Sequence, residues 1–132
     1  MSGQHHPSHL PNGNILVFDN GTRAGRSRVV EVDPVTKTIV WQYGTHPRET
    51  FFSEFAGSCE RLPDGNTLIA VAEDGRAFEI TPDGRTVWRW QTRKEPSTRT
   101  TSRVTFYRLA GVPQSVLAHL PARVPAAAPD RV

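Results

Sequence analysis

The chain has 132 residues, of which 36% are hydrophobic and 22% charged, enough apolar sequence for one folded domain with a modest core. Its net charge of +3 derives largely from late arginines that Pro, Ser and Thr separate, a pattern that predicts no nucleic-acid surface. No apolar run approaches the roughly 18 residues of a membrane helix. The N-terminus lacks the basic start and apolar stretch of a signal peptide, so we expect a cytoplasmic protein with no membrane contact.

A repeat with a period near 50 residues organises the chain. The sequence LPNGN at residues 10–14 returns as LPDGN at residues 62–66, an offset of 52. The later parts also return: VEVDP at residues 30–34 as FEITP at 78–82, and VWQY at 40–43 as VWRW at 87–90. Periods of this length are typical of propeller blades and other repeat folds.

Each copy reads as short strands joined by tight turns. The dipeptides Asn12-Gly13 and Asp64-Gly65 favour turns, because glycine tolerates positive φ. Apolar or alternating runs predict strands at residues 15–18, 28–32 and 38–43 of the first copy. The matching runs of the second copy are residues 67–71, 76–80 and 86–90, and residues 104–109 predict one more strand.

The expected fold class is therefore all-β, with two tandem four-stranded blade-like repeats that form a partial β-propeller. The first repeat covers residues 1–56, and the second repeat with a closing strand covers residues 57–110. Residues 111–132, rich in Ala, Pro and Arg towards their end, are expected to be a disordered tail. Trp41, Trp88 and Trp90 are expected to pack between blades, since a large aromatic side chain on a strand buries much area.

Histidines gather before the first turn, and the second copy has none there. His5, His6 and His9 precede Leu10 in what we expect to be a loop. The matching positions of the second copy are Gly57, Ser58 and Arg61. Function is often grafted where copies of a shared frame differ, but exposed loop histidines, or remnants of cloning, are equally open. The adjacent pair lacks a usual ligand spacing and an acidic partner, so no metal is expected.

The sequence around these histidines resembles the bacterial arylsulfotransferase family. The stretch QHHPSHLPNGNILVFDNG at residues 4–21 carries a Gln-His step before a strand that ends in Phe-Asp-Asn-Gly, as in that family. The resemblance continues through SRVVE at 27–31, VWQYG at 40–44, FFS at 51–53 and RVTFYR at 103–108. It covers about residues 3–110.

The resemblance implies a six-bladed propeller enzyme that moves a sulfonate group from a phenolic sulfate ester to a phenol, without cofactor, through a sulfohistidine. The histidine after glutamine corresponds to His5, and His6 is the alternative nucleophile because a one-residue slip would exchange them. Neutral imidazole is a good nucleophile near its pKa. Arg28 and Asn20 are the predicted substrate-binding residues, although an exposed strand position explains Arg28 better and an Asx turn explains Asn20 equally well.

The resemblance matches only the C-terminal third or so of such an enzyme, whose preceding blades supply further histidines and an arginine. We therefore expect a truncated protein or one piece of a larger assembly, with weak or absent turnover, whose full-length relatives can be exported. The alternative is a non-catalytic propeller fragment that acts as a binding or interaction module, with self-association through its open strand edges. A relation to quinone-cofactor propellers is a third interpretation, which loses because nothing resembles a quinone or calcium site.

Overall fold

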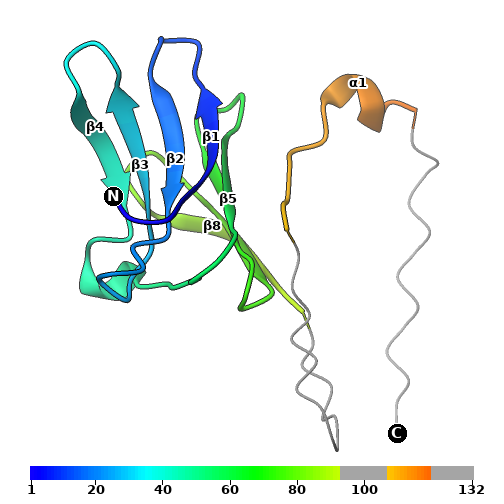
Figure 1. Ribbon diagram of the computed structural model, residues 1–132. Helices are drawn as coiled ribbons and strands as arrows, with labels where there is room; N and C mark the ends of the chain where they lie inside the picture. Colours follow the sequence, from blue (N-terminus) through cyan, green and yellow to red (C-terminus); the bar gives the residue numbers. More distant parts are fainter. Residues whose placement is uncertain (93–106, 120–132) are drawn as a thin grey trace, which may run out of the picture.

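The structure is a computed structural model that describes residues 1–92 and 107–119. Its strands form two four-stranded sheets (Figure 1). The first sheet contains β1 (Gln4–His9), β2 (Ile15–Asp19), β3 (Arg28–Asp33) and β4 (Thr38–Tyr43). The second contains β5 (Ser58–Arg61), β6 (Thr67–Val71), β7 (Arg76–Ile80) and β8 (Thr86–Gln91). Two short helices complete the elements, the 3-10 helix η1 (Pro47–Glu49) and α1 (Gln114–Leu117).

Each sheet is an antiparallel meander in which neighbouring strands follow one another in the sequence. The orders are β1-β2-β3-β4 and β5-β6-β7-β8, so each sheet has two open edges within residues 1–92 and 107–119. The predicted fold class is confirmed: the chain is all-β, with two four-stranded open sheets that fit a partial, propeller-like arrangement of blades.

The turn between the first and second strands has the same hydrogen bonds in both sheets. Leu10 N donates to Asn14 O at 2.8 Å, and Leu62 N donates to Asn66 O at 2.8 Å. The glycines inside these turns, Gly13 and Gly65, have φ of 89° and 90°, a conformation that side-chain-bearing residues rarely adopt. The repeated dipeptides therefore determine repeated turns.

The hydrophobic core lies between the two sheets. It includes Leu16, Phe18, Val29 and Tyr43 of the first sheet and Ile69, Val71, Phe78 and Ile80 of the second. Gly57 permits the close approach of β5 to β2, because a Cβ at this position would lie 2.7 Å from the ring of Phe18. The sheets thus pack directly, side chain against backbone.

Trp41 lies at the joint between the sheets, as predicted. Its Nε1 donates to Pro82 O at 3.1 Å, and the guanidinium of Arg61 lies 4.9 Å from the centroid of its ring. Arg61 also forms an ion pair with the buried Glu31, with 3.1 Å between Nη2 and Oε2. The interior positions predicted for Trp88 and Trp90 are wrong: these side chains are 44% and 43% exposed on β8.

Two sequence-based expectations concern the later part of the chain. Residues 104–106 of the predicted last strand lie outside the described residues, and residues 107–109 form no strand. The predicted tail contains α1, while residues 120–132 lie outside the described part. No helix among the described residues is long and apolar enough to span a membrane.

Candidate functional site

His5 and His6 lie on β1, not in the loop that the sequence predicted. Pairing between β1 and β2 shifts here: His5 is opposite Phe18 and Ser8 is opposite Leu16, so β1 carries one extra residue. This β-bulge and Pro7 break the alternation that would have revealed a strand. His6 has a φ of 47°, which a non-glycine residue adopts at a cost in energy. Bulges often direct side chains at functional sites.

His5 is half-buried, and its ring is held by Asn20. Nδ1 of His5 lies 2.7 Å from Oδ1 of Asn20 and 3.4 Å from the carbonyl oxygen of Gly3. Asn20 follows β2 and is fully buried. The site thus joins the first strand of the sheet to the end of the second.

The orientation of the Asn20 amide decides the protonation of His5. Nδ2 of Asn20 donates to the carbonyl oxygens of Ser53 at 2.8 Å and Ala56 at 2.7 Å. Both of its N–H groups are therefore used, and Oδ1 must face His5 as an acceptor. It follows that Nδ1 of His5 carries the proton, and in the neutral ring the lone pair is on Nε2.

His6 has a similar contact with the other sheet. Its Nδ1 lies 3.0 Å from the carbonyl oxygen of Cys59 on β5, which can only accept, so His6 also holds its proton on Nδ1. The thiol of Cys59 is buried, and burial raises its pKa to about 12 although the nearby Arg61 charge opposes this shift. Cys59 therefore stays a neutral thiol and offers no competing nucleophile.

A hydrogen-bond network, buried at Ser27 and half-buried at Glu73, connects Asn20 with residues 53–55. Ser27 Oγ donates to Asn20 O at 2.9 Å and accepts from Ser53 N at 3.0 Å. The Glu73 carboxylate accepts from the backbone N–H groups of Glu54 and Phe55. Neither Ser27 nor Glu73 was predicted as a site residue. Ser27 and Ser53 belong to stretches that carry the family resemblance, which is the signal that could have indicated these two serines.

Arg28 lies on the face of the first sheet opposite to the one that carries Phe18. It is opposite Asp19 in the pairing of β2 with β3, one residue from the Phe18–Val29 pair that faces the core. Its Nε donates to Asp19 Oδ2 at 2.9 Å and its Nη1 to Gln42 Oε1 at 3.1 Å. The structure therefore brings together His5, His6 and Asn20, while Arg28 is bound to other partners.

Metal ligation has little support in this part of the chain. Within residues 1–92 and 107–119, no group of three His, Cys, Asp or Glu side chains could hold a metal ion. His9, the third histidine before the first turn, is exposed at the end of β1. The two histidines of the bulge, His5 and His6, are thus the candidate reactive groups.

Comparison with known proteins agrees with the sequence resemblance. The family model described as Arylsulfotransferase (ASST) matches residues 1–93. No curated protein matches the chain. Among solved structures, a protein of unknown function from Bacteroides caccae has 20% sequence identity and a TM-score of 0.48, over 68% of this chain and 31% of that chain. The present chain thus spans about a third of that protein.

Proposed function

Because the chain belongs to the arylsulfotransferase family, we propose that it carries a sulfonate-transfer centre in which His5 is the nucleophile. The observation that carries this proposal is the His5–Asn20 contact, whose donor and acceptor are set by the two carbonyl oxygens that bind the Asn20 amide. This arrangement leaves Nε2 of His5 unprotonated, as a nucleophile must be. The substrates are a phenolic sulfate ester and a phenol.

In the first half-reaction, the Nε2 lone pair forms a bond to sulfur. The bond between sulfur and the phenolic oxygen breaks, and the phenolate leaves with the electron pair. The imidazole ring becomes positively charged while its proton stays on Nδ1. The Nδ1–H bond to Asn20 then becomes a charge-assisted hydrogen bond, so it strengthens as the reaction proceeds.

In the second half-reaction, the oxygen of an acceptor phenol attacks sulfur. The N–S bond breaks, its electron pair returns to Nε2, and the acceptor proton passes to solvent or to a base. Nε2 of His6 is also unprotonated in its neutral form and is the nearest base in the sequence. His6 is also the alternative nucleophile.

Asn20 serves this mechanism as a positioning residue. It is fully buried and its amide is engaged on both sides, so we assign it the orientation of His5 in place of direct substrate contact. The role of Arg28 as a sulfonate-binding residue stays a prediction, and its present partners are Asp19 and Gln42. Replacing Arg28 with Gln tests it through the concentration dependence of sulfonation.

Intact-mass spectrometry after incubation with p-nitrophenyl sulfate tests the proposal. We expect one added sulfonate, mapped by peptide fragmentation to His5, and its absence in His5→Ala. The exposed His9 provides the matched control, since His9→Ala should still accept the group. In Asn20→Ala the sulfonation rate should fall about tenfold to hundredfold, the loss expected for a charge-assisted hydrogen bond of about 1.5–3 kcal/mol.

The other outcomes have distinct meanings. An adduct on His6 that survives in His5→Ala would transfer the nucleophilic role to His6. A folded protein with no adduct would contradict the proposal and favour a non-catalytic fragment that acts as a binding module.

A further inference from the structure

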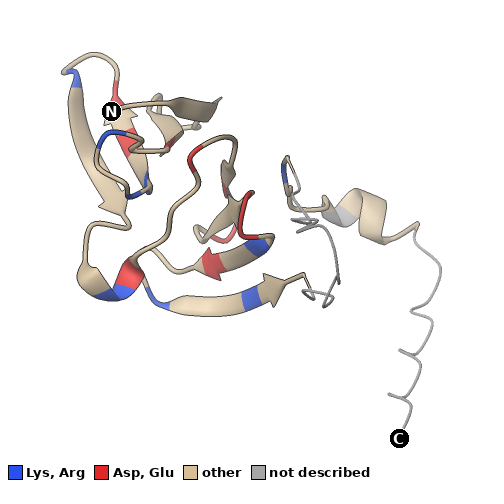
Figure 2. Ribbon diagram, turned by 60° about the horizontal axis from the view of Figure 1, so that its bottom comes forward, with Lys and Arg blue, Asp and Glu red and all other residues tan. Residues whose placement is uncertain are grey.

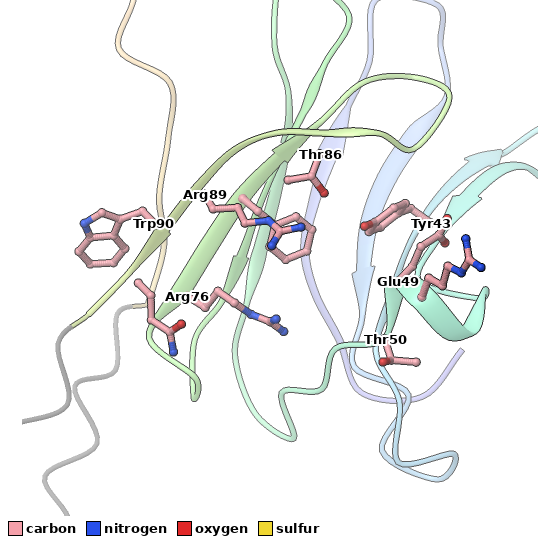
Figure 3. A pocket seen from close by; sticks show the side chains of 10 residues that line it. Tyr43, Glu49, Thr50, Arg76, Thr86, Arg89 and Trp90 are labelled. Atoms are coloured by element: carbon pink, nitrogen blue, oxygen red, sulfur yellow. The ribbon is translucent and has the colours of Figure 1, made fainter.

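A second site lies between the sheets, away from the histidines. A pocket of about 530 Å³ opens between β4 with η1 on one side and β7 with β8 on the other (Figure 3). This volume is within the range of small-molecule pockets, roughly 300–1,000 Å³. The residues that line it are Tyr43, Arg48, Glu49, Thr50, Arg76, Phe78, Thr86, Arg89, Trp90 and Gln91. None of the residues assigned to sulfonate transfer is among them.

The lining carries an excess of positive charge. The lining contains three guanidinium groups and one carboxylate, which belong to Arg48, Arg76, Arg89 and Glu49. One oxygen of this carboxylate already accepts from the backbone N–H of Gly44, at 3.2 Å. Figure 2 shows the basic positions of β7 and β8 on adjacent strands at this side of the molecule. Such a wall attracts anions.

Arg76 has an unsatisfied donor. Its Nε is buried and has no hydrogen-bond partner among the described residues. Its Nη2 lies 3.4 Å from the half-exposed carboxylate of Asp74, and its guanidinium lies 5.6 Å from the centroid of the Phe78 ring. A buried donor without a partner is unfavourable, and a small rotation of the Arg76 side chain that turns Nε into the pocket would let a bound oxyanion satisfy it.

Arg89 converges on the same space. The pairing of β7 with β8 sets Phe78 opposite Arg89 and Arg76 opposite Gln91, so both arginines share the face that carries Phe78. Figure 3 shows their guanidinium groups extending from β7 and β8 towards Tyr43 and Glu49. Within the described residues, Arg89 has no ion pair. Its charge is therefore available to a ligand.

Aromatic side chains form another part of the wall. The Tyr43 and Phe78 rings lie 6.1 Å apart between centroids. Burial raises the pKa of the Tyr43 phenol, and the Glu49 carboxylate adds to this shift, so the hydroxyl stays protonated and can donate a hydrogen bond. Both rings belong to the hydrophobic core and are only 6% and 7% exposed, so only small parts of them reach the pocket, and the planar guanidinium groups beside them favour a flat ligand.

We propose that this pocket binds a small aromatic oxyanion, with the negative group between Arg76 and Arg89 and the ring beside the exposed parts of Tyr43 and Phe78. The site is separate from the sulfonate-transfer centre and does not depend on it.

Titration calorimetry of the full chain with 2-naphthalenesulfonate tests this assignment. The probe has a carbon–sulfur bond and cannot sulfonate a histidine, so binding is read without turnover. We expect saturable binding that Arg89→Gln weakens about tenfold. Arg85→Gln, which removes an exposed arginine from the turn before β8, provides the matched control and should bind as the parent does. His5→Ala should also bind normally.

Two further ligands separate the contributions of charge and ring. Inorganic sulfate and 2-naphthol should each bind at least tenfold more weakly than 2-naphthalenesulfonate. Equal binding of 2-naphthol, or equal weakening by Arg85→Gln and Arg89→Gln, would overturn the proposal. Loss of binding in His5→Ala with full binding in Arg89→Gln would also overturn it, since the probe would then occupy the histidine site.

Discussion

The two sheets are built alike except at their first strands. In both, an asparagine after the first turn bonds to a glutamate on the third strand: Asn14 to Glu31 at 2.7 Å and Asn66 to Glu79 at 2.6 Å. In both, the pairing of the third and fourth strands shifts just after that glutamate. Turns, register and bulges therefore repeat over three strands.

The first strands differ in register and in chemistry. β1 contains the bulge, the strained His6 and the two histidine rings that contact Asn20 and Cys59. By contrast, β5 pairs with β6 without a shift in register. The position of β5 opposite Ala70 is occupied by Ser58, and the position equivalent to Asn20 is Ala72. The frame thus tolerates small residues where the first sheet carries an imidazole and the amide that holds it. The candidate site therefore lies where β1 differs from β5, and the repeated fold forms without its residues.

The largest expected effect comes from disrupting the close packing between β5 and β2. Gly57→Ala should lower the free energy of unfolding by about 3 kcal/mol, because φ is 121° and the new Cβ would meet the Phe18 ring. Urea denaturation measures this. Gly13→Ala is the control, since Gly13 also has positive φ but nothing within 4 Å, and should cost about 1 kcal/mol. Equal losses would show that the close packing of β5 on β2 is unimportant.

Removing the amide that distinguishes the first sheet should have the next largest effect. Asn20→Ala leaves the carbonyl oxygens of Ser53 and Ala56 without their donor, so we expect a loss of about 2 kcal/mol in the same assay. Asn12→Ala removes an exposed turn amide and should cost less than about 1 kcal/mol. A loss no larger than that of Asn12→Ala would mean that the Asn20 network does not hold the loop.

The positions before the two turns offer a smaller comparison. Arg61 stacks on Trp41 and pairs with Glu31, whereas His9, its counterpart, is exposed. Arg61→Ala should therefore destabilise the protein by about 1–2 kcal/mol and His9→Ala by less than about 0.5 kcal/mol. Thermal unfolding of both variants is sufficient, and equal shifts in Tm would be incompatible with this inter-sheet contact.

Glu31, which pairs with Arg61 across the two sheets, should make the free energy of unfolding depend on pH in the acid range. Burial acts to raise its pKa, but hydrogen bonds from Asn14 and Asn12 and the charge of Arg61 outweigh it, so the pKa is lowered from 4.5. A carboxyl group with a lowered pKa in the folded state stabilises the protein above its unfolded pKa, and this contribution is lost as pH falls through the folded value. Unfolding free energies of the parent and Glu31→Gln should hence converge as pH falls below about 4.5. A difference that does not change with pH would contradict this role.

Much of the fold was predictable because its signals are local. The turn dipeptides and the strand runs they bound lie within a few residues of one another, and the structure contains the strands predicted between residues 15 and 90. β1 was missed because Pro7 and the bulge interrupt its alternation. The exposure of Trp88 could not be predicted, since the burial of its counterpart Trp41 depends on the second sheet packing against the first.

The residues of the candidate site were predictable from the sequence, but the hydrogen bonds that connect them were not. His5 and His6 stood out because the second repeat lacks them. The carbonyl oxygens that orient Asn20 come from residues 53 and 56, more than 30 positions away in the sequence. Only folding brings them together, so sequence alone could not distinguish a substrate-binding asparagine from a positioning one.

The protonation state of His5 tests the central claim most directly. Long-range ¹H–¹⁵N NMR of the imidazole groups near pH 8 identifies which nitrogen carries the proton. For His5 the contact with Asn20 predicts a proton on Nδ1 and a free lone pair on Nε2, and Asn20→Ala should abolish this preference. A proton on Nε2 of His5 in the parent protein would contradict the account, because the nitrogen proposed to attack sulfur would then be blocked.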